Sequence, residues 1–66
     1  MKLNGKAIKL RRIELNIRQK ELAEKININA NTLSLIENNK AMTSLKKIFK
    51  LCEILQVPIE YLFIEE

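Results

Sequence analysis

Two short amphipathic segments stand three residues apart in the middle of the chain, and this spacing restricts the fold more than any other feature. Residues 18–26 ("RQKELAEKI") and residues 30–38 ("ANTLSLIEN") each place aliphatic side chains at helical spacing. The connection, residues 27–29, is short for an antiparallel return but long enough for a steep crossing between two helices. The inward-facing residues are Leu22, Ala23 and Ile26 in the first segment and Leu33 and Ile36 in the second.

Three asparagines are suited to shape the ends of these helices. Asn27 can end the first helix in the left-handed conformation, which asparagine tolerates better than most residues that have a Cβ atom. Asn39 can end the second helix in the same way, and Asn29 can accept hydrogen bonds from the first free amides as an N-cap. The predicted arrangement is the geometry of a helix-turn-helix.

The rest of the chain also indicates helices, because it contains one glycine, one proline and few aromatic residues. We predict an all-α fold of five helices in a single domain, residues 1–66, with the helix-turn-helix at about 19–38. The predicted helices span residues 5–15, 18–26, 30–38 and 44–55, and Pro58 opens the fifth. The fourth is expected to bury Leu45, Ile48, Leu51, Cys52 and Leu55.

The composition argues against several classes of protein. The chain has no histidine and a single cysteine, Cys52, so we expect no metal site, no disulfide and no cofactor. Without a histidine or a second acid at useful spacing, no enzyme active site is expected, and Glu37 is interpreted as structural. The start of the chain lacks the pattern of a secretory signal, and no apolar run is long enough to span a bilayer. These features predict a cytoplasmic protein in which Cys52 is a small core residue.

The charge distribution favours a polyanionic partner. Twelve Lys and Arg against eight Asp and Glu give a net charge of +4, and five of the basic residues precede the first acid, Glu14. Nucleic acid is the commonest partner of such a basic half, although a merely solvated face gives the same pattern.

The outward face of residues 30–38 carries amides, a hydroxyl and one leucine but no charge, which is unusual for an exposed helical surface. Such a face suits the base edges of a DNA major groove, where asparagine can pair with adenine and leucine can cover a thymine methyl group. Leu35 also fits an ordinary exposed aliphatic residue. The outward-facing residues are Ala30, Asn31, Ser34, Leu35 and Asn38.

These motifs resemble the phage-repressor, Cro-like (Xre) family of bacterial DNA-binding proteins. The stretch "RQKELAEKININANTLSLIENNK" is similar to that family's signature of Gln-x-x-Leu-Ala, a turn, and Thr-(Ile/Leu)-x-x-(Ile/Leu)-Glu. The closing "LKKIFKLCEILQVPIEYLF" resembles the family's last two helices, and the resemblance implies a compact five-helix, lambda-repressor-like domain. The matching signature residues are Gln19, Leu22, Ala23, Thr32, Leu33, Ile36 and Glu37.

The resemblance also implies roles for individual residues. Arg12 stands where the family carries an arginine in its first helix, and it would form a largely buried ion pair with Glu37. Gln19 would contact a phosphate and also brace the third helix. Base edges would be faced by Ala30, Asn31, Ser34 and Leu35, and the DNA backbone would be contacted by Arg18, Gln19, Asn38, Lys40, Thr43 and Ser44.

Several positions depart from the family pattern. Arg18 replaces a Ser or Thr cap and cannot accept a hydrogen bond from free helix amides, so a nearby phosphate explains it better than helix stability does. Thr43 replaces a common proline and leaves the path of that loop open. Ala30 replaces a long polar side chain, which predicts fewer direct base hydrogen bonds and more dependence on DNA shape.

The segment "PIEYLFIEE", residues 58–66, has more apolar side chains than one short helix can bury. Leu62 is the best core candidate, and the remaining apolar residues predict an interface. We expect a homodimer through the region 57–66, which would present two recognition helices to half-sites about 34–36 Å apart in a palindromic operator. The predicted central interface residues are Ile59, Phe63 and Ile64, and Phe49 is a further candidate.

The sequence therefore predicts a dimeric, sequence-specific transcription regulator that consists of little more than its DNA-binding domain. A repressor and a restriction-modification controller protein both fit, and an activator would in addition contact RNA polymerase. The alternative is a protein-interaction module, such as an antitoxin or antirepressor-like domain, in which Asn31 and Ser34 would be dispensable and the apolar end essential. A membrane-active basic helix is disfavoured by the polar outward face of residues 30–38.

Overall fold

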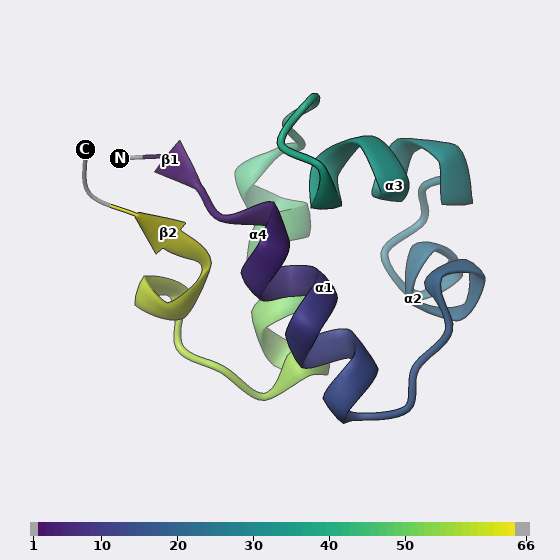
Figure 1. Cartoon of the computed structure of the whole chain (residues 1–66), viewed down its shortest axis with the longest axis horizontal. Helices are drawn as coiled ribbons and strands as arrows, with labels where there is room; N and C mark the ends of the chain where they lie inside the picture. Colours follow the sequence, from purple (N-terminus) through teal and green to yellow (C-terminus); the bar gives the residue numbers. More distant parts are fainter. Residues whose placement is uncertain (1, 65–66) are drawn as a thin grey trace.

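Four α-helices make up most of the computed structural model, which describes residues 2–64 (Figure 1). Each begins and ends within one residue of its predicted bounds. The helices are α1 (Gly5–Glu14), α2 (Gln19–Lys25), α3 (Ala30–Glu37) and α4 (Leu45–Leu55). After α4 come a short 3-10 helix, η1 (Ile59–Leu62), and a strand, β2 (Phe63–Ile64), which pairs with β1 (Lys2–Leu3) at the start of the chain.

The core lies where these elements meet. In Figure 1, α1 crosses in front of α4, with α2 and α3 on one side of this pair and η1 and the two strands on the other. Every element except β2 contributes a buried hydrophobic residue, so one contiguous core holds the chain together. The largest fully buried side chains are Ile8, Leu22, Leu33, Ile36, Ile48, Leu51, Leu55 and Leu62.

The prediction of an all-α fold with five helices was wrong at the end of the chain. Pro58 precedes only a four-residue 3-10 helix, and Phe63 then turns to an extended conformation (φ −120°, ψ 145°). This backbone lets Phe63 pair with Leu3 in a two-stranded antiparallel sheet. The Asn4 amide extends the connection by donating to the Leu62 carbonyl at 2.7 Å. An α-helix continued through Phe63 would give up this pairing.

The expected burial of Leu45 was also wrong, because its side chain is 58% exposed. Helical side chains lean toward the N-terminus of their helix. Leu45 is the first residue of α4, so its side chain extends beyond the core on which Ile48 and Leu51 pack.

The predicted helix ends are confirmed. Asn27 and Asn39 adopt the left-handed conformation with φ of 61° and 60°, and Asn29 Oδ1 accepts a hydrogen bond from the Thr32 amide at 2.7 Å. Asn16 and Gln56 are left-handed as well, with φ of 58° and 57°, and they were not predicted. Asn29 before α3 and Asn39 after it therefore have the roles that the sequence predicted.

The beginning of α1 packs directly on the end of α3. Gly5 is buried there, and a Cβ atom at this position would overlap the carbonyl oxygen of Ile36 and lie 2.7 Å from that of Glu37. Only a residue without a side chain allows this approach between two backbones.

Within residues 2–64, no helix is long and apolar enough to cross a membrane.

Candidate nucleic-acid interface

Helix α3 is held in place by its inner face and by the turn that precedes it. Leu33 and Ile36 are fully buried, and α3 packs against both α2 and α1. Ile26 is the C-cap of α2, and the left-handed Asn27 follows it. Asn29, three residues after Ile26, is the N-cap of α3. This short connection leaves one face of α3 on the surface of the molecule, at the upper edge in Figure 1.

The outer face of α3 is polar but uncharged. Asn31 is exposed, Ala30 and Ser34 are half-buried, and Leu35 is 46% exposed. The single charged residue of α3, Glu37, points inward and is 4% exposed. The residues predicted to face bases thus lie on one helix, with no ionic side chain among them.

Asn38, at the C-cap of α3, is exposed, and its side-chain amide is already engaged. Its Nδ2 atom donates to the Ser34 carbonyl oxygen at 2.8 Å. Its side-chain oxygen remains on the surface and can accept a bond from a water or a ligand. Asn31 makes no side-chain hydrogen bond within residues 2–64, so its donor and acceptor groups face solvent.

A buried polar cluster fixes the orientation of α3. Arg12 Nε and Nη2 donate to the two carboxylate oxygens of Glu37 at 2.8 and 3.3 Å, a bidentate arrangement. Gln19 Nε2 donates to Glu37 Oε1 at 3.0 Å, and Arg12 Nη1 donates to the Ile17 carbonyl at 3.0 Å. The structure therefore brings Arg12, Gln19 and Glu37 together, and the cluster joins α1, α2 and α3. Every buried side-chain polar atom in the described part of the chain has a partner.

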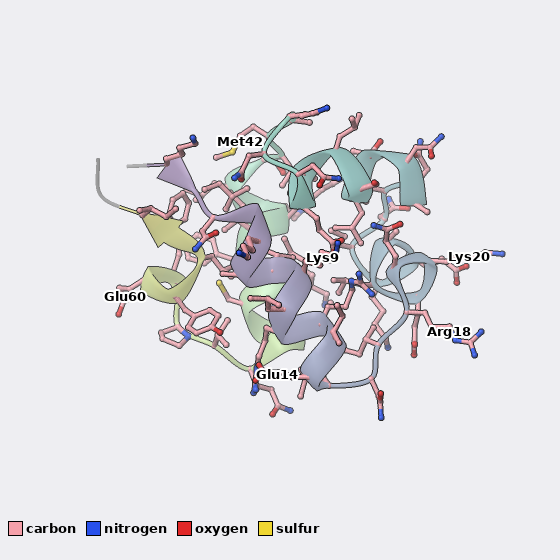
Figure 2. The ribbon with its side chains drawn as sticks, viewed as in Figure 1. Lys9, Glu14, Arg18, Lys20, Met42 and Glu60 are labelled. Carbon is pink, nitrogen blue, oxygen red and sulfur yellow. The ribbon has the colours of Figure 1, made fainter. Side chains whose placement is uncertain are left out.

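Two exposed cationic side chains stand at the start of α2. Arg18 and Lys20 project away from the body of the molecule (Figure 2). The Arg18 side chain makes no cap hydrogen bond, while its backbone amide donates to Glu21 Oε1 at 3.4 Å. Lys20 was not among the predicted contacts, and it is exposed beside Arg18 at the same helix start.

After the C-terminal end of α3, the predicted backbone contacts lie on the loop that leads to α4. Lys40 and Ser44 are exposed and Thr43 is half-buried. Ser44 Oγ accepts a hydrogen bond from the Lys47 amide at 3.3 Å, so this hydroxyl caps α4 as well as facing solvent. Exposed cations thus lie at the start of α2, and a cation and hydroxyls lie on the loop after α3.

The predicted dimer residues divide into two groups. Phe49 and Ile64 are 54% and 42% exposed, so they are free to meet a partner. Ile59 and Phe63 are half-buried and pack against the core of their own chain, which reduces the area they can offer. Glu65 and Glu66, at the end of the predicted region 57–66, lie outside the described residues.

Cys52 belongs to the core and not to the surface site. Burial raises the pKa of its thiol above the ordinary value, and the nearby negative charge of Glu60 acts in the same direction. A thiol with a raised pKa is a poor nucleophile at neutral pH, which agrees with a packing role.

Comparisons with known proteins agree with this geometry. The family model described as helix-turn-helix matches residues 8–62. Among solved structures, the chain is similar to the restriction-modification controller protein C.AhdI from Aeromonas hydrophila, with a TM-score of 0.78. That likeness has 24% sequence identity and covers 89% of this chain and 86% of the other. No curated protein matches the sequence.

Proposed function

This chain belongs to the helix-turn-helix family, and we propose that it is a sequence-specific regulator that binds double-stranded DNA as a homodimer. The observation that carries the proposal is the uncharged outer face of α3, together with the exposed cations at the start of α2 and the cation and hydroxyls on the loop after α3. Base edges in the major groove present hydrogen-bond donors, acceptors and methyl groups, while the flanking backbones present phosphates.

Each side chain of the outer face then has a chemical role. Asn31 donates to N7 and accepts from N6 of an adenine, and Ser34 bonds to either kind of base-edge group. Leu35 and Ala30 contact thymine methyl groups and exclude water from the polar pairs. Ala30 cannot form a hydrogen bond with its side chain, so the operator's shape contributes to its recognition.

The backbone contacts position this face without reading sequence. Arg18 meets one phosphate at the start of α2, where the amides of the first helical turn also favour an anion. Gln19 is already bonded to Glu37, so a phosphate contact by Gln19 would be linked to the placement of α3. The second backbone is contacted by Asn38, Lys40, Thr43 and Ser44.

Dimerisation places two copies of α3 on two half-sites. Exposed Phe49 and Ile64 form the centre of the proposed interface, and the half-buried Ile59 and Phe63 support it. A two-fold axis would space the helices by one turn of DNA, about 34–36 Å, and requires a palindromic operator. The likeness to a restriction-modification controller protein supports a role in regulating transcription. We propose that this chain acts either as a repressor or, with RNA polymerase as a further partner, as an activator.

A protein-interaction module remains the second candidate, because Phe49, Tyr61 and Ile64 expose apolar surface outside α3. In that case a protein would cover these residues and α3 would be dispensable. Substitution of Asn31 and Ser34 separates the two functions, since only DNA binding depends on them.

Selection from a pool of random duplexes tests the proposal, with the bound fraction measured at two salt concentrations. We expect a palindrome with half-sites about one helical turn apart and an affinity that falls steeply with salt. If no sequence is enriched and binding is weak even at low salt, the proposal is wrong and the apolar surface becomes the place to search for a partner.

A further inference from the structure

A basic groove lies between the end of α2 and the first turns of α4. Its volume is about 360 Å³, and four of its six lining residues are lysines while none is acidic. We call it the lysine groove, and it is lined by Lys25, Ile26, Asn27, Lys46, Lys47 and Lys50.

One of these lysines has a structural role. Lys47 Nζ donates to the Asn27 carbonyl oxygen at 3.1 Å, which places a positive charge at the end of α2. Such a charge stabilises the C-terminal end of a helix. This bond also holds α4 against the turn between α2 and α3, so the groove has a fixed position next to the start of α3.

The other three lysines of the groove have no comparable structural role. Lys25 and Lys46 are exposed, and neither has a carboxylate partner within residues 2–64. Lys50 Nζ lies 3.3 Å from Glu53, but both side chains are more than half exposed, so this pair is weak. Gathering like charges around one hollow is unfavourable without an anion, and the arrangement therefore indicates an anionic ligand.

The position of the groove indicates which anion it binds. Asn27 lines the groove, and α3 begins three residues later at Ala30, the first of the residues proposed to face bases. We infer that the lysine groove binds phosphates of the DNA backbone next to the turn of DNA that α3 enters. This inference rests on the proposed function and adds a contact at the end of α2 and the first turns of α4, at the opposite end of α2 from Arg18.

The groove reads no sequence, because lysine ammonium groups meet phosphates as point charges. Its contribution must therefore be the same on an operator and on an unrelated duplex. It must also appear in the salt dependence, since each phosphate contact contributes about 0.9 to the slope of log affinity against log salt.

The test compares two double variants that remove the same charge. Lys25→Gln/Lys46→Gln removes two groove lysines and spares Lys47, which bonds to Asn27. Lys6→Gln/Lys9→Gln removes two exposed lysines from α1, which does not line the groove. Affinity is measured over a series of salt concentrations, on the selected operator and on an unrelated duplex of equal length, with thermal unfolding as a check of folding.

We expect the groove variant to lower the salt slope by about 0.9 for each phosphate that it no longer neutralises, and to weaken binding to both duplexes by the same factor. The α1 variant should change the slope by clearly less. If the two variants change the salt slope and the affinity equally, the inference is wrong, because the loss then follows from net charge alone. An acidic polypeptide is then the next ligand to test for the lysine groove. If the unsubstituted protein binds no duplex, the proposed function fails first, and this result is distinct from the others.

Discussion

The side-chain oxygen of Asn39 accepts a hydrogen bond from the backbone amide of Gly5 at 2.8 Å, across thirty-four positions of sequence. The first amides of a helix have no partner inside the helix, and this bond supplies one for the first residue of α1. Asn39 therefore does two things, because its left-handed backbone ends the α3 turn while its side chain caps α1. The end of the proposed recognition helix is joined in this way to the start of the domain.

Gly5→Ala is expected to destabilise the domain by about 1–3 kcal/mol or more, because the new methyl group would overlap backbone atoms of α3. Ala favours helices more than Gly, so propensity alone predicts the opposite sign. Lys6→Ala, at the exposed neighbouring position, is the control and should leave stability nearly unchanged. Urea unfolding of both variants measures the difference, and a Gly5→Ala domain as stable as the unsubstituted protein would contradict the packing described.

Asn39→Gly is expected to cost more stability than Asn27→Gly, although both asparagines are left-handed with nearly equal φ. Glycine adopts this conformation freely, so the backbone term is the same at the two positions. The difference, about 1–3 kcal/mol, is the bond to Gly5 together with the buried amide left without a partner. Equal unfolding free energies for the two variants would show that the bond contributes nothing.

Glu37→Ala is expected to remove about 3–5 kcal/mol of stability, because it leaves Arg12 as a buried charge without a carboxylate partner. That loss is comparable with the whole stability of a small domain, so the variant should be largely unfolded at room temperature. Glu14→Ala is the matched control, since Glu14 pairs with Arg11 at 3.6 Å on the surface. Circular dichroism on heating distinguishes the two, and a cooperative transition near the unsubstituted temperature in Glu37→Ala would contradict this account.

Ile64→Lys is expected to convert a dimer into a monomer, because it places a charge in the proposed apolar interface. Leu10→Lys, at a similarly exposed residue of α1, should leave the oligomeric state unchanged. Sedimentation equilibrium measures the masses, with thermal unfolding to check that both variants fold. A monomeric unsubstituted protein, or an Ile64→Lys protein that still dimerises, would rule out this interface.

The helix-turn-helix could be predicted because its signals are local. Asn27 and Asn29 bound a three-residue connection, and the helical spacing of Leu33 and Ile36 determines which face of α3 points outward. The end of the chain gave no such signal. Its strand has two residues and pairs with a strand more than fifty positions away, so no period of hydrophobic residues indicates it.

The candidate site also has a part that local sequence predicts and a part that depends on contacts between distant segments. The outward residues of α3 follow from their helical positions, whereas the lysine groove exists because Lys47 on α4 crosses to Asn27 at the end of α2. The spacing of lysines along α4 indicates only a solvated face. Gly5 was placed at a helix start from sequence, but its contact with α3 depends on how the two helices approach each other.

The most direct test of DNA recognition by α3 is the affinity of Asn31→Ala for the selected operator and for an unrelated duplex at one salt concentration. Asn31 is exposed, so the substitution should leave unfolding unchanged. We expect the free energy of binding to the operator to weaken by about 1–3 kcal/mol and the sequence preference to be lost at one base position. Binding to the unrelated duplex should stay unchanged. If Asn31→Ala binds the operator as tightly as the unsubstituted protein does, this residue of α3 does not read the bases as proposed.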